Sequence, residues 1–225
     1  MTTARPRPGP RLAVFDCDGT LIDGQASICD AMERACGELG LPLPHRNDVR
    51  RAVGLSLPQA ARRLLPEHDN ATHHAVADAY KRHFRAAREA GELSQPLFDG
   101  IVTVIEGLAS DSWLLGVATG MSGRGLAHCL ATHGLSRQFI TLQTADRHPS
   151  KPHPAMLEAA LFEAAADPDM AVMIGDTAFD MAMARDAGVR GIGVAWGYHL
   201  PAELREAGAE WIAETPADLL DYLRG

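Results

Sequence analysis

The sequence predicts an α/β protein: a doubly wound parallel sheet with a Rossmann-like core, into which an all-helical cap domain is inserted. Three observations predict this fold. A short apolar run at residues 12–15 is typical of a buried strand. Residues 23–93 show only the spacing of amphipathic helices. From about residue 94, short apolar runs alternate with helical stretches, as in parallel sheets covered by helices on both faces.

The bulk composition is that of an ordinary globular protein. The chain has 225 residues, of which 46% are hydrophobic, and a net charge of -8, which argues against a nucleic-acid partner. No apolar run approaches membrane-spanning length, and the first residues lack the apolar segment of a signal peptide. We therefore expect a cytoplasmic protein with no membrane partner, and the oligomeric state stays open. The four cysteines form no CxxC pair, so we expect reduced thiols and no zinc site.

The expected domain boundaries follow these changes of pattern. We expect a disordered tail at 1–10, an α/β core at 11–22 and 94–225, and a helical cap at 23–93. In the cap, a capping box beginning at Ser56 would open one helix and Thr72 would cap another. The cap histidines lack metal-ligand spacing, and we expect them on solvated helix faces: His45, His68, His73, His74 and His83.

In the core, the pattern of apolar residues predicts that helices and strands alternate. The expected strands are 114–118, 139–142, 171–174 and 191–194, and the expected helices are 101–108, 125–133, 154–166, 177–187 and one opened by Thr215. Ligands of such sheets bind beyond the carboxyl ends of the strands. The residues that follow each strand are therefore the candidates for a functional site.

The most informative of these segments follows the first strand and reads Asp16-Cys17-Asp18-Gly19-Thr20. Side chains alternate along a strand, so two carboxylates at i and i+2 share one face. Such a pair repels itself unless a cation neutralises it, which favours a metal site or a division into acid and nucleophile. Gly19 and Thr20 then turn the chain, and we expect their backbone N–H groups to stay free near the site.

Three further signals fall after later strands. Thr119-Gly120 offers a hydroxyl and an unhindered N–H, and Lys151 is one of only two lysines against nineteen arginines. Asp176 and Asp180 lie in the segment 175–180, where Thr177 and Asp180 also fit a helix capping box. Each signal alone has a purely structural explanation. Together, in this order at successive strand ends, they indicate one site, with Lys151 beside Asp16 and Asp176.

These motifs resemble those of the haloacid dehalogenase superfamily, and within it phosphatases like phosphoglycolate phosphatase. The resemblance covers nearly all of residues 11–225 and depends most on the DxDGT motif at 16–20. It implies that Asp16 is the nucleophile and Asp18 the general acid and base. It also implies that Thr119 and Lys151 hold the phosphoryl oxygens.

The same resemblance implies a Mg2+ cofactor. The ion would be bound by Asp16, the backbone carbonyl of Asp18 and Asp176, with Asp180 acting through water or from behind these ligands. The helical insert at 23–93 matches the mobile cap of the family.

The resemblance also suggests where substrate binds. Gly19, Thr20 and Gly120 would contact the phosphoryl group. The turn 53–56 resembles the specificity region of the cap, and the neighbouring Arg50 and Arg51 are candidates for a substrate carboxylate. That these two arginines are simply solvated is an equally good interpretation. The implied substrate is a small phosphorylated metabolite such as phosphoglycolate.

Four alternative functions make different demands on these residues. A dehalogenase of this family lacks the second aspartate, so Asp18 argues against it. A sugar-phosphate mutase carries a histidine ten residues after that aspartate, where this chain has Ile28. A phosphonate hydrolase needs an early cap lysine, whereas Lys81 lies deep in the third expected cap helix. A non-catalytic phosphate-binding or regulatory module stays open, although all motif carboxylates are present.

Overall fold

The chain is described over residues 9–225 by a computed structural model. Of the tail expected at 1–10, residues 1–8 lie outside the described residues. No helix among the described residues is long and apolar enough to cross a membrane.

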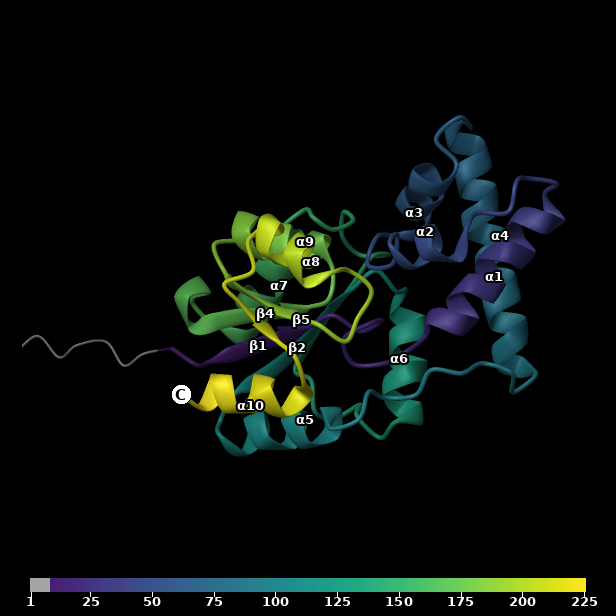
Figure 1. Ribbon diagram of the computed structural model, residues 1–225. Coiled ribbons are helices and arrows are strands. Elements are labelled where there is room, and N and C mark those ends of the chain that lie inside the picture. Colours follow the sequence, from purple (N-terminus) through teal and green to yellow (C-terminus); the bar gives the residue numbers. More distant parts are fainter. Residues whose placement is uncertain (1–8) are drawn as a thin grey trace, which may run out of the picture.

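A parallel sheet forms the centre of the described chain (Figure 1). Its strand order is β3-β2-β1-β4-β5-β6, with β1 in the middle, paired to β2 from Leu12 opposite Leu114 and to β4 from Leu12 opposite Ala171. The strands are β1 (Leu12–Phe15), β2 (Leu114–Thr119), β3 (Thr141–Thr144), β4 (Ala171–Gly175), β5 (Arg190–Val194) and β6 (Trp211–Ala213). The doubly wound parallel sheet expected from the sequence is confirmed.

Helices pack on both faces of this sheet, and the strands are therefore buried on both faces. Ala13 and Phe15 of β1 pack with α5 (Ile101–Ser110), α6 (Gly123–Thr132) and α10 (Pro216–Arg224). Leu12 and Val14, which point the other way, pack with α7 (Ala155–Ala164) and α8 (Ala178–Asp186). The remaining core helices are the short η1 (Pro168–Met170) and α9 (Pro201–Ala207). Figure 1 shows α5 and α10 on one side of the sheet and α7, α8 and α9 on the other.

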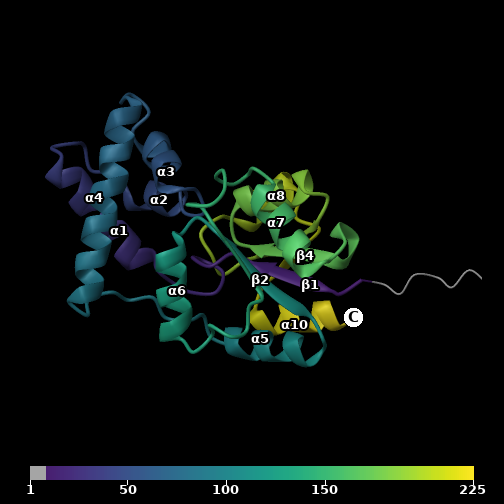
Figure 2. The same cartoon turned by 180° about the vertical axis from the view of Figure 1, so that it is seen from behind.

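Four helices between β1 and α5 form a separate cap: α1 (Gln25–Glu38), α2 (Arg46–Arg50), α3 (Leu57–Leu64) and α4 (Asn70–Glu89). They enclose a hydrophobic cluster of their own, which includes Cys29 and Cys36. Figures 1 and 2 show the cap beyond the carboxyl ends of the strands, with α6 on the side of the core that faces it. The two connections to the core meet where the N–H of Asp23 donates to the carbonyl of Pro96 at 2.8 Å.

Several local expectations need correction. The strand expected at 139–142 runs from Thr141 to Thr144. Phe139 is apolar because its ring packs edge-on against Phe15, with centroids 6.4 Å apart, and not because it lies in the sheet. All four cysteines are free and buried, in agreement with the expected thiols.

The cap helices begin differently from the expectation. Ser56 precedes α3 but makes no side-chain capping bond. Its N–H donates to the core hydroxyl of Ser150 at 2.8 Å, whereas in a capping box it would donate to the side chain three residues later, here Gln59. Asp69, not Thr72, caps α4, because its carboxylate accepts from the N–H of Thr72.

One cap histidine also departs from the expected solvated position. His73 is buried, and its Nε2 lies 2.9 Å from the carbonyl oxygen of Leu65. It joins the end of α3 to α4 and is part of the packing of the cap.

Candidate active site

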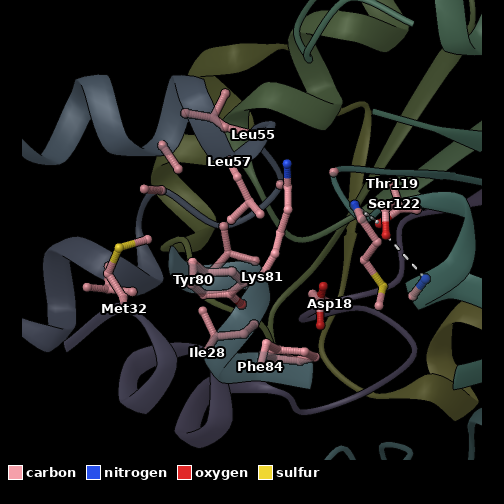
Figure 3. A pocket seen from close by; sticks show the side chains of 18 of the residues that line it. Asp18, Ile28, Met32, Leu55, Leu57, Tyr80, Lys81, Phe84, Thr119 and Ser122 are labelled. Atoms are coloured by element: carbon pink, nitrogen blue, oxygen red, sulfur yellow. Dashed lines mark hydrogen bonds between the residues drawn. The ribbon is translucent and has the colours of Figure 1, made fainter. Parts of the chain in front are cut away.

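The expected site residues converge at the carboxyl ends of the strands. Asp16 and Asp18 directly follow β1, Thr119 ends β2 and Asp176 follows β4. Lys151 reaches the same place from the loop between β3 and α7. This end of the sheet faces the cap, and Figure 3 shows Asp18 and Thr119 across the cavity from the cap side chains.

Lys151 lies at the centre of the charged cluster. Its ammonium is 3.0 Å from Asp16 Oδ1 and 2.6 Å from Asp180 Oδ1, and only 2% of the residue is exposed. Burial alone would lower the pKa of Lys151, but the two carboxylates hold it above its usual value. The expectation that Lys151 lies beside Asp16 is confirmed. Its second carboxylate partner is Asp180, and not Asp176 as expected.

Asp180 has both of its oxygens occupied. Oδ1 accepts from Lys151, and Oδ2 accepts from the N–H of Thr177 at 3.0 Å and from its hydroxyl at 2.7 Å. The Thr177–Asp180 capping box predicted from the sequence is therefore present. The same residue both starts α8 and fixes the lysine, because its two oxygens serve different partners.

The carboxylates of Asp16 and Asp18 are held in different ways. Asp16 Oδ1 accepts from Lys151 and from the N–H of Cys17 at 2.6 Å, whereas its Oδ2 is buried with no hydrogen-bond partner among residues 9–225. Asp18 Oδ1 is likewise buried and unpartnered within the described chain. Burial raises the pKa of Asp16 to about 6, opposed by Lys151, and burial with repulsion from Asp16 raises the pKa of Asp18 to about 7.

Asp176 is fixed by neighbours from two other segments. Its Oδ1 accepts from the Thr20 hydroxyl at 2.8 Å, and its Oδ2 accepts from the N–H of Tyr198 at 2.9 Å. Burial, Asp16 and Asp180 together raise its pKa well above the ordinary value. Gly19 packs directly against this carboxylate with φ +89°, where a side chain would be strained and would collide with Asp176.

The donor set fits a hard divalent cation. Asp16, Asp176 and Asp180 each offer a carboxylate oxygen, and these atoms lie within 4.8 Å of one another in a buried position. Three buried carboxylates with one ammonium leave an excess of negative charge. Carboxylate and carbonyl oxygens are the ligands that Mg2+ and Ca2+ prefer.

One expectation about the first motif is wrong. The N–H of Gly19 donates to the carbonyl of Ile22 at 2.8 Å, and the N–H of Thr20 donates to the carbonyl of Cys17 at 3.3 Å. The turn is tight enough to use these groups internally, so they are not free for a ligand. Instead, Gly19 packs against the carboxylate of Asp176, and the hydroxyl of Thr20 donates a hydrogen bond to it.

Thr119 and Gly120 face the cap. The hydroxyl oxygen of Thr119 accepts from the N–H of Met121 at 3.2 Å, which leaves its proton available to another acceptor. Gly120 touches the cap turn at 53–56: a Cβ there would lie 2.6 Å from the carbonyl oxygen of Leu55. This turn is therefore the part of the cap that lies directly against the core motifs.

A cavity of about 480 Å3 lies between the cap and the core. Asp16, Asp18, Thr119 and Gly120 line its core side. Arg50 and Arg51 are not among the residues that line it. Arg50 donates to Asn47 at 2.6 Å.

Arg51 binds the core and not the cavity. It forms a two-pronged ion pair with Glu203 of α9, one contact of which measures 3.1 Å. Its carbonyl oxygen lies 3.2 Å from Nε2 of His199. The structure therefore brings Arg51 to a contact between cap and core.

The α4 wall of the cavity was not predicted from the sequence. Tyr80, Lys81, Phe84, Arg85 and Arg88 all line it from this one helix. Their spacing of three and four residues places them on one helical face, which is the signal that could have identified them. Lys81, which lies too late in the cap to be the lysine of a phosphonate hydrolase, is among them.

The comparisons with known proteins agree with this geometry. Residues 13–194 match the haloacid dehalogenase-like hydrolase family. A relative from Dickeya dadantii named probable phosphatase IndB is 33% identical, over 93% of this chain and 91% of its own length. A phosphoglycolate phosphatase from Pseudomonas syringae is 29% identical, over 96% of this chain and 78% of its own length.

Solved structures extend the likeness to the whole described fold. A hydrolase from Pseudomonas syringae has a TM-score of 0.84 at 25% identity, covering 95% of this chain and 98% of its own. A haloacid dehalogenase-like hydrolase from Streptococcus pneumoniae has a TM-score of 0.83 at 26% identity, covering 95% and 98%.

The chain therefore belongs to the haloacid dehalogenase-like hydrolases. Within that family it is similar to phosphatases, so the expected class of enzyme, a phosphoric monoester hydrolase, is confirmed.

Proposed function

We propose that this protein is a Mg2+-dependent phosphomonoesterase that acts through an aspartyl-phosphate on Asp16. The single observation that carries the proposal is the asymmetry of Asp16. Lys151 and the Cys17 N–H hold one carboxylate oxygen, while the other is buried and has no partner within the described residues. An oxygen oriented in this way is suited to in-line attack on phosphorus.

Asp18 is suited to the proton transfers. We expect Asp18 rather than Asp16 to carry a proton, because Lys151 lies 3.0 Å from Asp16 and stabilises its anion, whereas Asp18 Oδ1 is buried without a partner in the described residues. Protonated Asp18 would donate to the leaving alkoxide as it departs. The resulting carboxylate would then take a proton from the water that hydrolyses the aspartyl-phosphate.

Lys151 and Thr119 would stabilise the transferred group. The Lys151 ammonium offsets the repulsion between the Asp16 carboxylate and a phosphate dianion, and Asp180 keeps it in place. The free proton of the Thr119 hydroxyl can reach a phosphoryl oxygen from the end of β2. These groups position charge rather than perform covalent chemistry, which is the main demand of phosphoryl transfer.

Asp16, the backbone carbonyl of Asp18 and Asp176 would hold the Mg2+, with Asp180 behind them. When bound, the ion supplies charge neutralisation for the phosphoryl oxygens and the attacking carboxylate. Thr20 and Tyr198 keep Asp176 oriented toward that position through the hydrogen bonds described above. We also propose that the cap domain begins at residue 23 and ends at residue 93. The contact between Asp23 and Pro96, where the two connections to the core meet, supports these boundaries.

The substrate would be a small phosphorylated metabolite, and phosphoglycolate is the first to test, since relatives carry that name. A cytoplasmic location stays a prediction. The mutase alternative gains no support, because Ile28 is apolar and lines the cavity where that alternative needs a proton carrier.

Release of inorganic phosphate tests the proposal. The full chain is dialysed against EDTA and then assayed on phosphoglycolate and a generic aryl phosphate. We expect no turnover until Mg2+ is added, and inhibition by Ca2+, whose larger coordination sphere can recruit both Asp16 oxygens. Full activity in EDTA would refute the metal assignment. No phosphate release from any ester would favour the non-catalytic module, and conversion of a sugar 1-phosphate to its 6-phosphate would favour the mutase.

A further inference from the structure

The cap side of the cavity is apolar where it faces the reacting groups. Ile28, Met32, Leu57, Tyr80 and Phe84 line it, opposite Asp18 on the core side (Figure 3). The carboxylates that line the cavity, Asp16, Asp18 and Asp146, all belong to the core. A leaving alcohol bound to this wall therefore meets hydrocarbon.

Two aromatic rings lie together in this wall. Tyr80 and Phe84 lie one turn apart on α4, and their rings stack with centroids 5.5 Å apart and planes inclined by 19°. Tyr80 is buried in the cap cluster, whereas Phe84 is only partly buried at its edge. Ring faces of this kind favour contact with another apolar or aromatic group.

The cations of α4 line the same cavity beside this apolar wall: Lys81, Arg85 and Arg88. Lys81 and Arg85 are exposed, and Lys81 pairs with Asp78 at 3.1 Å. A carboxylate placed against Ile28 and Met32 would lose water without gaining a donor, which is costly.

The size of the cavity also favours a leaving alcohol that is larger than that of phosphoglycolate. Its volume of about 480 Å3 lies within the range of roughly 300–1,000 Å3 in which proteins bind drug-sized ligands. The alcohol of phosphoglycolate is only a methylene and a carboxylate, so it would leave most of the apolar wall uncovered.

We propose that the cap wall selects phosphomonoesters whose alcohol carries an apolar, ring-sized group that lies against Tyr80 and Phe84. The inference rests on the proposed phosphomonoesterase function for the reacting end and adds the class of leaving alcohol.

The test compares benzyl phosphate with ethyl phosphate on the full chain with Mg2+. Both release alkoxides of similar basicity, so the ratio of their kcat/KM values reports the binding of the ring. We expect benzyl phosphate to be favoured by at least about tenfold, as burial of a ring-sized apolar group implies. A ratio below about twofold would overturn the proposal.

Two substitutions of phenylalanine locate the effect. Phe84→Ala should reduce the benzyl-to-ethyl ratio by about fivefold or more, because it removes the partly buried ring of the wall. Phe84→Leu should give an intermediate ratio and guards against loss of folding, which thermal melting would reveal. The matched control is Phe162→Ala on α7, since Phe162 is 87% exposed and does not line the cavity. Equal losses on both substrates in Phe84→Ala would also overturn the proposal.

Failure of the proposed function has a different signature. If neither ester is hydrolysed, calorimetric binding of benzylphosphonate and ethylphosphonate still measures the preference. Tighter binding of the benzyl compound supports the apolar wall, and equal binding contradicts it. Hydrolysis of both esters without preference leaves the phosphomonoesterase intact and removes only the selection by the cap.

Discussion

The core and cap sides of the cavity are built from opposite materials. The core side rests on a buried charged cluster whose polar atoms are mostly hydrogen-bonded: Asp16, Lys151, Asp176 and Asp180. The cap side is mainly hydrocarbon, and the cations that also line it, Lys81, Arg85 and Arg88, all come from α4. The core can therefore provide a fixed field for one reaction, while the cap offers a surface whose shape can select among leaving groups.

The difference has a physical basis in how each side tolerates change. A buried charge is stable only beside a partner of opposite charge. Removing one member of the core cluster therefore leaves the remaining charges buried without a partner, which costs free energy. The free energy of apolar contacts grows with the area that they bury, and one apolar side chain can be replaced by another of similar volume at little cost. We therefore expect large effects from single changes in the core and graded effects from changes in the cap.

The largest effect should come from Asp16→Asn. The amide is nearly isosteric but cannot form the acyl-phosphate, so turnover should fall by at least about 10²–10⁴-fold, the scale expected for loss of a central catalytic group. Phosphate release and thermal melting of the same preparation measure activity and folding separately.

Labelled substrate provides the positive counterpart to this loss. Acid quenching of the wild-type protein should trap phosphate on Asp16 and on no other residue. More than about a hundredth of wild-type activity in Asp16→Asn would contradict its role as nucleophile, since even loss of acid–base help costs about that much.

Lys151→Arg should fail nearly as badly as Lys151→Met. The ammonium fills a closed position between Asp16 and Asp180, and a planar guanidinium is larger and cannot act as a compact point charge. Loss of this donor should lower kcat by about 10²–10³-fold in both variants. The same substitution at the exposed Lys81 should change kcat by less than about threefold. Near-normal turnover in Lys151→Arg would remove Lys151 from the phosphate site.

Much of the core could be predicted because its signals are local. An apolar strand followed by Asp-x-Asp fixes both the burial and the shared face of Asp16 and Asp18, and helix caps such as Thr177 mark the following elements. What the sequence could not fix is which carboxylate pairs with Lys151. Asp176 and Asp180 lie four residues apart, and only the packing of α8 against the sheet decides that Asp180 faces the lysine.

The cap was harder to predict because its surfaces depend on tertiary contacts. Tyr80 and Phe84 have the spacing of any buried helix face, and nothing in their pattern separates packing inside the cap from contact with a cavity. Arg51 lies in a basic stretch that resembles a ligand site, but its partner Glu203 is far away in sequence. Long-range pairs of this kind carry no local signal.

Gly120→Ala tests how closely the cap must approach the core. The new Cβ would lie 2.6 Å from the carbonyl oxygen of Leu55 and 2.8 Å from that of Gly54, so the cap turn must move away. Overpacking of about 1–3 kcal/mol should lower kcat/KM by about 5- to 150-fold without unfolding the chain. The control is Gly37→Ala in α1, where a Cβ meets nothing within 4 Å. Unchanged kcat/KM in Gly120→Ala would show that this contact does not matter for catalysis.

Arg51→Ala and Glu203→Gln separate two roles for Arg51. If Arg51 joins the cap to the core, both variants should raise KM by the same factor, about two- to fivefold, for phosphoglycolate and for ethyl phosphate, as loss of a partly exposed ion pair implies. If Arg51 binds a substrate carboxylate, only Arg51→Ala should raise KM, and only for phosphoglycolate. Arg50→Ala serves as the comparison, because Arg50 contacts Asn47 within the cap.

The smallest effect should be an acid dependence of this ion pair. Its hydrogen bonds from Arg51 lower the pKa of Glu203 from the ordinary 4.5 to about 2. A lowered pKa means that the stabilisation is fully present above pH 4.5 and is lost as the pH falls toward 2, because the unfolded chain takes up the proton first. The pair is partly exposed, so its contribution should be only about 0.2–1 kcal/mol. Thermal melting of wild type and Glu203→Gln should therefore differ slightly at pH 6, and the difference should shrink as the pH falls from 4.5 toward 2. A difference between the two proteins that grows on acidification would contradict this assignment.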